Sequence, residues 1–325
     1  MATIRLLNVD EIASGTGKVL DVDALGSMPL PVADGHSFSA DSVMFGGGYG
    51  GSASNVCDLK QFSSAANAVD YGDLTAARYK LKAASDGSQA MFTGGYSNTH
   101  MNISDLKTFS SAANAVNHGS LTAPRSQHAA ASDGQQVMNG AGNVGSPSSS
   151  CDLKLFSSTA NATAHGSLSQ SRMGLAAGSD GTQVIFGGGI SGSMTGVCDL
   201  KLFPDNATAV SHGSLHQTRM DLSGTSDATQ VMFGGGWGGS SNVATCDMKL
   251  FSDSSYSSVH GDLSQARTVA GTGSDGTQAM FGGGWGSSAV NTCDLKQFSS
   301  TATALDFGDL IQARGVTTGA SGTAA

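Results

Sequence analysis

The side chains best suited to chemistry recur in register along this sequence of 325 residues. An arginine ends a Gly-x-Leu-x-x-x-Arg pattern six times, and an aspartate stands two positions before a lysine six times. The arginines are Arg78, Arg125, Arg172, Arg219, Arg267 and Arg314, and the aspartates are Asp58, Asp105, Asp152, Asp199, Asp247 and Asp294. An arginine beside an aspartate can form an ion pair and also donate to backbone carbonyls. Because a catalytic site usually breaks symmetry, we expect these residues to pair within or between units as structural elements.

Five cysteines share one position of the repeat, where the second unit has Ser104. They are Cys57, Cys151, Cys198, Cys246 and Cys293. If the units form a ring, equivalent positions lie too far apart for the Cα separation of about 4–7 Å that a disulfide requires. The same separation excludes a shared zinc ion. We therefore expect free, buried cysteines that pack as small apolar side chains.

A second recurring position carries a flat ring. It holds His118, His165, His212 and His260 in four units, and Tyr71 or Phe307 in the other two. Because tyrosine and phenylalanine replace histidine here, we expect structural packing, with no bound metal and no cofactor. The segment Ser179-Asp180-Gly181 is likewise interpreted as a tight turn, since its spacing differs from that of a sialidase Asp-box.

These positions belong to a repeat of 47 or 48 residues that occurs six times. In the fourth unit, four short strands are expected at residues 172–178, 183–186, 197–203 and 207–210, separated by Gly-, Asp- and Pro-containing turns. Four strands per unit at this period are typical of a β-propeller blade. The sequence predicts an all-β, six-bladed propeller with four antiparallel strands in each blade.

The two ends of the repeat region complement each other. The first unit lacks a first strand before Phe45, whereas residues 314–322 match that missing strand in register. We expect the C-terminal strand to complete blade 1 and to pair the two open edges. The predicted domains are a docking segment at residues 1–36 and a propeller at residues 37–325.

Composition excludes several classes of protein. The chain has 46 glycines, only 13% charged residues and a formal net charge of −9. It is too apolar for a disordered chain and lacks the glycine period of collagen. The negative charge offers no basic surface for nucleic acid or anionic lipid. An odd number of cysteines, and no apolar run long enough for a signal peptide or a membrane span, predict a soluble protein made in the cytosol.

The loop between the second and third strands of each unit varies most. In four of the six units this loop begins with an aromatic residue among Gly, Ser and Asn: Tyr49, Tyr96, Trp237 and Trp285. These rings either contact a ligand or pack beneath their own loops, and both alternatives remain open. Tyr79, Lys80 and Lys82 follow Arg78 and would border the same face.

Gly-Gly after an apolar strand, a late third strand and an arginine opening the next unit resemble kelch repeats. The pattern Phe-Gly-Gly-Gly…Asp…Asn-Ala-Thr-x-x-Gly-x-Leu-x-x-x-Arg is similar to that of kelch-like proteins of marine tailed bacteriophages, over roughly residues 37–322. The sequence departs from cellular kelch repeats by lacking the tryptophan of the fourth strand.

The resemblance implies a non-enzymatic virion structural protein, such as a tail, fibre or head appendage. Residues 1–36 would attach it to other virion proteins, and its loop face would bind a host-surface glycan or a neighbouring subunit. Two alternatives remain open. A polysaccharide-degrading propeller would need clustered carboxylates, for which Asp70, Asp73, Asp221 and Asp262 are the candidates that break the repeat. An intracellular kelch-type interaction module is the other.

Overall fold

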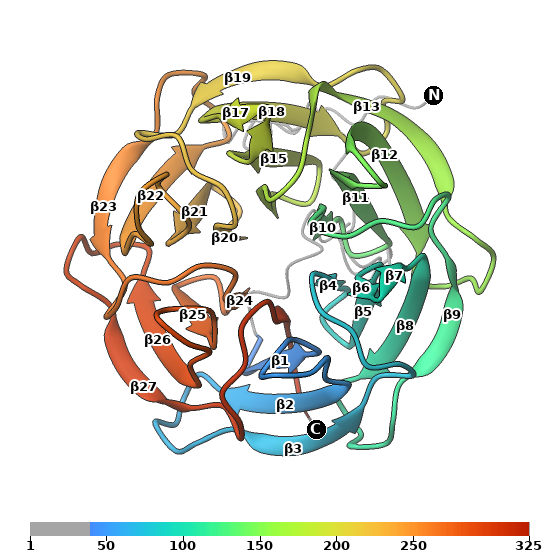
Figure 1. The fold of residues 1–325 in the computed structure, drawn as a ribbon, viewed down its shortest axis with the longest axis vertical. Helices are drawn as coiled ribbons and strands as arrows, with labels where there is room; N and C mark the ends of the chain where they lie inside the picture. The colour runs from blue at the N-terminus through green and yellow to red at the C-terminus, as the bar shows by residue number, and fades with distance from the viewer. Residues whose placement is uncertain (1–39, 325) are drawn as a thin grey trace, which may run out of the picture. The chain divides into compact units, whose positions relative to one another are not determined.

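The computed structural model describes residues 40–324, which form a six-bladed β-propeller (Figure 1). Each blade is a four-stranded antiparallel sheet whose strands follow one another from the axis outward. Blade 1 contains β28 (Thr318–Gly322), β1 (Ser42–Gly46), β2 (Val56–Gln61) and β3 (Val69–Asp73); blade 2 contains β4 (Lys82–Ser85), β5 (Gln89–Thr93), β8 (Ile103–Thr108) and β9 (Val116–Ser120); blade 3 contains β10 (Ala129–Ser132), β11 (Gln136–Asn143), β12 (Pro147–Leu155) and β13 (Thr163–Arg172).

The other three blades repeat this order. Blade 4 contains β14 (Ala176–Ser179), β15 (Gln183–Gly187), β18 (Val197–Leu202) and β19 (Val210–Ser214); blade 5 contains β20 (Ser223–Ser226), β21 (Gln230–Gly234), β22 (Thr245–Leu250) and β23 (Ser258–Asp262); blade 6 contains β24 (Gly271–Ser274), β25 (Gln278–Gly282), β26 (Thr292–Gln297) and β27 (Leu305–Asp309). Two small hairpins, β6 (Tyr96–Ser97) with β7 (Thr99–His100) and β16 (Ile190–Ser191) with β17 (Ser193–Met194), extend the loops of blades 2 and 4. The predicted fold is confirmed.

The turn at Ser179-Asp180-Gly181 joins β14 to β15 as expected. The Asp180 carboxylate accepts the backbone N–H groups of Thr182 and Gln183 at 2.8 and 2.9 Å, and the Ser179 hydroxyl accepts that of Gly181. These local hydrogen bonds hold the reversal between the two innermost strands.

Two of the strands expected in blade 4 have other bounds in the structure. The first strand of blade 4 begins at Ala176 rather than Arg172, which is instead the last residue of β13; between them the chain turns at Gly174, which has a φ of 68°. The fourth strand spans Val210–Ser214 rather than residues 207–210, and it includes Gly213 at a φ of 78°. Positive φ at these positions was not readable from apolar patterning.

The ring closes through the C-terminal strand. β28 pairs with β1 in antiparallel register from Ser42↔Gly322 to Gly46↔Thr318. Arg314, just before β28, forms an ion pair with Asp58 on β2. The predicted closure is confirmed, and the two open edges of the repeat satisfy each other's backbone groups.

Neighbouring blades pack through a phenylalanine that lies against a glycine. A Cβ added to Gly46 would lie 2.5 Å from the ring of Phe92, which is closer than packed atoms come, so only glycine admits the ring. Five of the six seams between blades use such a pair: Gly46–Phe92, Gly140–Phe186, Gly187–Phe233, Gly234–Phe281 and Gly282–Phe45. The seam between blades 2 and 3 has Thr93 and Asn139 instead.

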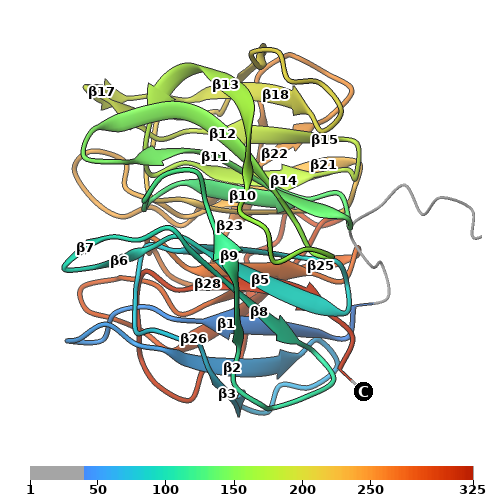
Figure 2. The same ribbon diagram turned by 90° about the vertical axis from the view of Figure 1, so that its right-hand side faces the viewer.

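Figure 2 shows the ring from the side. The hairpin β6–β7 and strand β17 lie at one face, and β28 ends toward the other. We call the first of these the loop face. Among residues 40–324 we find no helix with the length and apolar character needed to cross a membrane.

Candidate ligand-binding face

One backbone pairing builds the loop face in every blade. The residue that follows the glycines after the second strand pairs with the residue that follows the repeat arginine of the same blade, as in Tyr49↔Gly315 and Tyr79↔Tyr96. The Tyr49 N–H donates to Gly315 O at 2.8 Å, and the Tyr96 N–H donates to Tyr79 O at 2.7 Å. The backbone therefore presents two side-chain positions per blade, side by side on this face.

Four aromatic rings at these positions, together with His100 of the β6–β7 hairpin, form a continuous row across blades 6, 1 and 2. Ring centroids lie 6.4 Å apart for Trp285 and Tyr49, 5.2 Å for Tyr49 and Tyr79, 5.6 Å for Tyr79 and Tyr96, and 5.2 Å for Tyr96 and His100. We call these five residues the aromatic arc. Trp285 is 37% exposed and the other four are half-buried, so part of each ring reaches the surface.

The rings of the arc are tilted against one another, with interplanar angles between 43° and 76°. Tilted and edge-to-face contacts are favourable, and they hold each ring in place before a ligand arrives. Gly315 leaves room for the Trp285 ring at the junction of blades 6 and 1, because a Cβ there would lie 2.8 Å from that ring. The result is a preformed apolar surface edged by phenol hydroxyls, an indole N–H and an imidazole.

The structure brings together three of the four rings predicted to contact a ligand. Tyr49, Tyr96 and Trp285 belong to the arc, and Tyr79 lies between the two tyrosines. Trp237, half-buried on blade 5, lies outside it. The rings pack against one another: Tyr49 against Trp285 of the neighbouring blade, and Tyr96 against His100 of its own loop. Contact with a ligand stays a prediction.

Sequence reasoning missed His100 and understated Tyr79. His100 lies in the variable loop, and its backbone pairs with Tyr96 in the β6–β7 hairpin. The sequence held a signal: Ser97-Asn98-Thr99 between Tyr96 and His100 is typical of a turn, and in the structure Asn98 has a φ of 65°. Tyr79 follows a repeat arginine, a position that other blades fill with Gly, Ser, Met or Thr.

The repeat arginines and aspartates are buried as ion pairs, with N–O distances between 2.9 and 3.1 Å, all within single blades. The pairs are Arg314–Asp58, Arg78–Asp105, Arg125–Asp152, Arg172–Asp199, Arg219–Asp247 and Arg267–Asp294. Arg172 also donates to the carbonyls of Gly188 and Val197 at 2.9 and 2.6 Å. The expected pairing is present in every blade. Each pair joins the segment that leads into the first strand of a blade to the third strand of the same blade.

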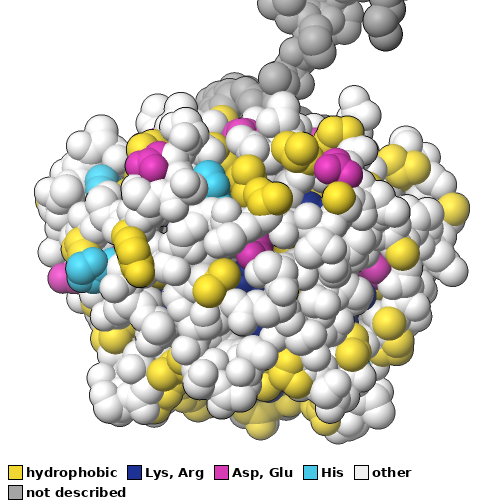
Figure 3. Space-filling model, turned by 90° about the horizontal axis from the view of Figure 1, so that it is seen from above, with side chains coloured by type: hydrophobic (Ala, Val, Ile, Leu, Met, Phe, Trp, Pro, Cys, Tyr) yellow, Lys and Arg dark blue, Asp and Glu magenta, His cyan; other side chains and the backbone are white. Residues whose placement is uncertain are grey.

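The repeat lysines have a similar structural role. Lys201 donates to the carbonyls of Asp205 and Ala207 at 2.8 and 2.6 Å, in the turn between the third and fourth strands. On the rim of the ring seen in Figure 3, lysine and arginine side chains are almost entirely covered. These cations stabilise turns and are not presented to a ligand.

The recurring rings at the fourth strand join each blade to the next. His165 Nε2 lies 3.2 Å from Leu202 O of the following blade, and His118, His212 and His260 make equivalent contacts. The Tyr71 hydroxyl donates to Phe109 O at the same place. The flat-ring position thus carries a hydrogen bond between blades in addition to packing.

The five cysteines are free and buried. Burial raises the pKa of Cys198 to about 12, so its thiol is protonated at neutral pH. In the part of the chain that the structure describes, no cluster of three or more His, Cys, Asp or Glu side chains could hold a metal ion.

The four acidic residues considered for catalysis are not brought together. Asp70 and Asp73 lie on the outer strand of blade 1, and Asp262 ends the outer strand of blade 5. Asp221 lies alone at the axis, where its carboxylate accepts a hydrogen bond from Gln127 Nε2 at 3.2 Å. Two carboxylates acting on one bond must face a common site, and these residues do not.

Six residues with positive φ form a ring of backbone around the axis. Each stands two positions after a repeat arginine, and φ ranges from 51° to 68°: Lys80, Gln127, Gly174, Asp221, Val269 and Val316. Backbone N–H groups link neighbours in this ring, for example Gln127 N to Lys80 O at 3.0 Å and Asp221 N to Gly174 O at 2.7 Å. We call it the axial ring. It ties the entering loops of the blades to one another at the loop-face end of the first strands.

No protein-family model matches this chain, and no curated protein matches it. The structure shows the six-bladed propeller itself, and the kelch-like resemblance rests on the sequence motifs. The predicted attachment role of residues 1–36 lies outside the described residues.

Proposed function

We propose that this propeller is a non-enzymatic binding module whose aromatic arc binds a glycan. The observation that carries the proposal is the unbroken row of rings from Trp285 to His100 on one side of the loop face. Binding sites combine apolar and aromatic surface with a few placed polar groups, and the arc has this composition.

A glycan fits the arc better than a small apolar ligand does. The C–H face of a sugar ring packs on an aromatic ring, and the spacing between rings is of the order of one sugar unit. An extended chain would contact successive rings and place its hydroxyls beside the phenol oxygens and the exposed loop residues Asn98 and Thr99. Part of each ring of the arc reaches the surface, so a polymer can lie across the arc and continue beyond its ends.

We further propose that the protein is a virion appendage made in the host cytoplasm, attached to other virion proteins through residues 1–36. The similarity of the repeat pattern to kelch-like proteins of marine tailed phages supports this placement. Mass spectrometry of purified particles tests it. Finding the chain in stoichiometric amount supports a structural role, and its absence from particles contradicts it.

The glycan proposal is tested by screening the purified chain against an array of surface polysaccharides, with Trp285→Ala and Tyr79→Ala measured in parallel. We expect binding that both substitutions weaken, while the melting temperature changes little because both rings are partly exposed. Binding unchanged in both variants, or release of shortened oligosaccharides by the wild-type chain, would contradict the proposal.

A further inference from the structure

Two lysines stand apart from every other cation in the described chain. The full sequence has 16 lysines and arginines, of which Arg5 and Lys18 precede the described residues. Six arginines form the ion pairs inside the blades, and six lysines follow the repeat aspartates. The two that remain within residues 40–324 are Lys80 and Lys82. They interrupt the repeat at one place, in blade 2, immediately after the arc residue Tyr79.

Lys80 is held beside the arc by its backbone. Its N–H donates to Val316 O at 3.3 Å, and its carbonyl accepts the N–H of Gln127 at 3.0 Å, so the axial ring fixes it from both sides. The Lys80 ammonium nitrogen lies 5.8 Å from the centroid of the Tyr79 ring. The side chain is half-buried, and it also lines a small pocket at the axial ring together with Gln127 and Asp221. Lys80 therefore lies between the aromatic arc and the axis.

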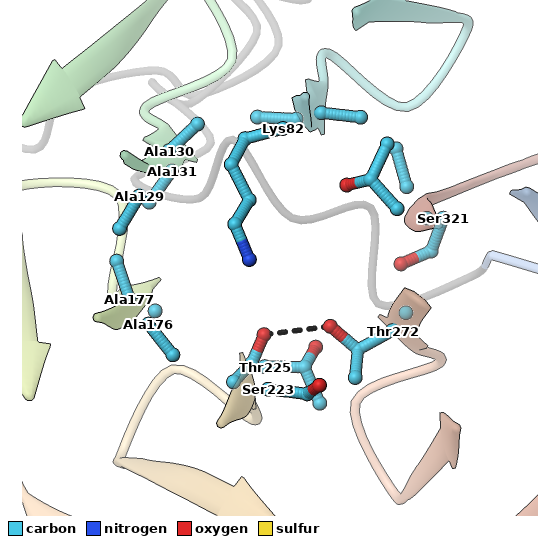
Figure 4. A pocket seen from close by; sticks show the side chains of 18 of the residues that line it. Lys82, Ala129, Ala130, Ala131, Ala176, Ala177, Ser223, Thr225, Thr272 and Ser321 are labelled. Atoms are coloured by element: carbon cyan, nitrogen blue, oxygen red, sulfur yellow. Dashed lines mark hydrogen bonds between the residues drawn. The ribbon is translucent and has the colours of Figure 1, made fainter. Parts of the chain in front are cut away.

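Lys82 begins β4 and extends toward the axis in the space enclosed by the first strands (Figure 4). This cavity has a volume of about 70 Å³ and is lined almost entirely by Ala, Gly, Ser and Thr. Lys82 belongs to none of the ion pairs found among residues 40–324. Burial lowers the pKa of Lys82, and the Asp221 carboxylate opposes that effect.

The rest of the molecule would repel an anionic ligand. The chain carries a formal net charge of −9, and the cations of the repeat are buried within the blades. The long-range field is screened over about 8–10 Å at physiological ionic strength, so charge close to the arc dominates local recognition. A neutral glycan would need no cation at the arc, whereas Lys80 lies beside it and Lys82 lies in the neighbouring cavity on the axis.

We propose that the glycan bound by the arc is acidic, and that the Lys80 ammonium binds a carboxylate of a uronic-acid unit while the sugar rings pack on Tyr79 and Tyr49. Lys82 lies two residues further along and adds positive potential from the cavity without contacting the glycan. This inference rests on the proposed glycan-binding function and specifies the class of ligand.

The test compares two hexasaccharides by calorimetry, an oligoglucuronate and the same oligosaccharide with its carboxyl groups reduced to alcohols. We expect the wild-type chain to bind the acidic form roughly tenfold more tightly or better, as for one hydrogen bond to a charged group. The difference should shrink as salt is raised, because a partly exposed charge pair is screened.

Three variants separate a direct contact from a general charge effect. Lys80→Gln should remove most of the preference for the acidic form and leave binding of the reduced form unchanged; glutamine is accommodated because Gln127 occupies the same ring position at a φ of 52°. Lys80→Arg should retain the preference. Asn117→Asp on the outer strand β9 lowers the net charge equally, at a position where blade 1 already has Asp70, and should change neither affinity.

The outcomes distinguish the inference from the function on which it rests. Equal affinity for the two hexasaccharides, or a preference that survives Lys80→Gln, overturns the acidic-ligand inference while glycan binding stands. Failure of the wild-type chain to bind either form, together with no effect of Trp285→Ala on any array ligand, overturns both.

Discussion

Blades 6, 1 and 2 share their architecture with blades 3, 4 and 5 but present different side chains on the loop face. In both halves the same two positions pair through the backbone, as in Tyr79↔Tyr96 of blade 2 and Met173↔Ile190 of blade 4. One half carries the aromatic arc. The other half carries Asn143, Ile190 and the separate Trp237 at the loop position.

The comparison shows that different residues determine the scaffold and the surface. The buried ion pairs and the turn-binding lysines occur in all six blades. The loop-face positions lie outside those contacts, so their side chains vary while the backbone is kept. Function is therefore expected where the repeat is broken: at the arc, at Lys80 and Lys82, and at the polar seam between blades 2 and 3.

Removing ring closure should have the largest effect, and it should affect both halves equally. Deletion of residues 314–325 removes β28 and the Arg314–Asp58 ion pair, leaving β1 without its inner neighbour. We expect loss of cooperative unfolding, monitored by circular dichroism and calorimetry. A melting temperature equal to that of the full chain would contradict closure.

Breaking one buried ion pair should cost similar stability in either half. Arg78→Ala in blade 2 and Arg172→Ala in blade 4 each leave a buried aspartate without its cation, which costs about 3–5 kcal/mol. Denaturant unfolding measures both variants. Costs that differ by several-fold would show that the two halves do not share one scaffold.

Substitutions on the loop face should separate the halves. Trp285→Ala should weaken glycan binding by about 1–2 kcal/mol, or roughly tenfold, through loss of an exposed stacking surface. Trp237→Ala is the matched control, because Trp237 occupies the equivalent position and pairs with Met220 as Trp285 pairs with Thr268. Calorimetry should show that the Trp237→Ala variant binds the glycan with an affinity close to that of the wild-type chain. Equal losses in the two variants would refute the assignment of the site to blades 6, 1 and 2.

The seam between blades 2 and 3, which has polar side chains in place of the Gly–Phe pair, should make stability depend on pH. Thr93 Oγ1 lies 2.6 Å from Asn139 Oδ1 and 3.1 Å from His128 Nε2, and all three side chains are buried. Burial lowers the pKa of His128 well below its usual value, so this histidine is neutral in the fold. The unfolded chain binds a proton below about pH 6.5, and the folded chain does not. Stability is therefore lost as pH falls below that value.

A variant that restores the regular seam sharpens this prediction. Thr93→Gly, Asn139→Phe and His128→Leu together introduce the residues that blades 1 and 2 use at Gly46, Phe92 and Leu81. The variant should lose less stability between pH 7.5 and 5 than the wild-type chain, by on the order of 1 kcal/mol. Part of the pH dependence of stability should remain, because burial also lowers the pKa of His118, His165, His212 and His260.

His216→Gln is the control, because His216 is exposed. Identical pH profiles for the wild-type chain, the triple variant and this control would contradict the role of the seam.

Most of the fold was predictable because the residues that make its main contacts recur in all six units. The blade count, the closure by residues 314–322 and the Arg–Asp pairing depend on residue types that recur in register. The axial ring was not predictable, since it requires positive φ at residues as different as Val316 and Lys80. The arc was only partly predictable, because its rings come from three blades and three positions of the repeat, and their adjacency depends on the curvature of the ring.

The two tryptophans permit a direct measurement of where the glycan binds. Trp237→Phe leaves Trp285 as the one fluorophore of its kind, and Trp285→Phe leaves Trp237. Titration with the acidic hexasaccharide should change the emission of the first variant with a single affinity and leave the second unchanged. A response confined to the variant that retains Trp237 would contradict a binding site on the arc.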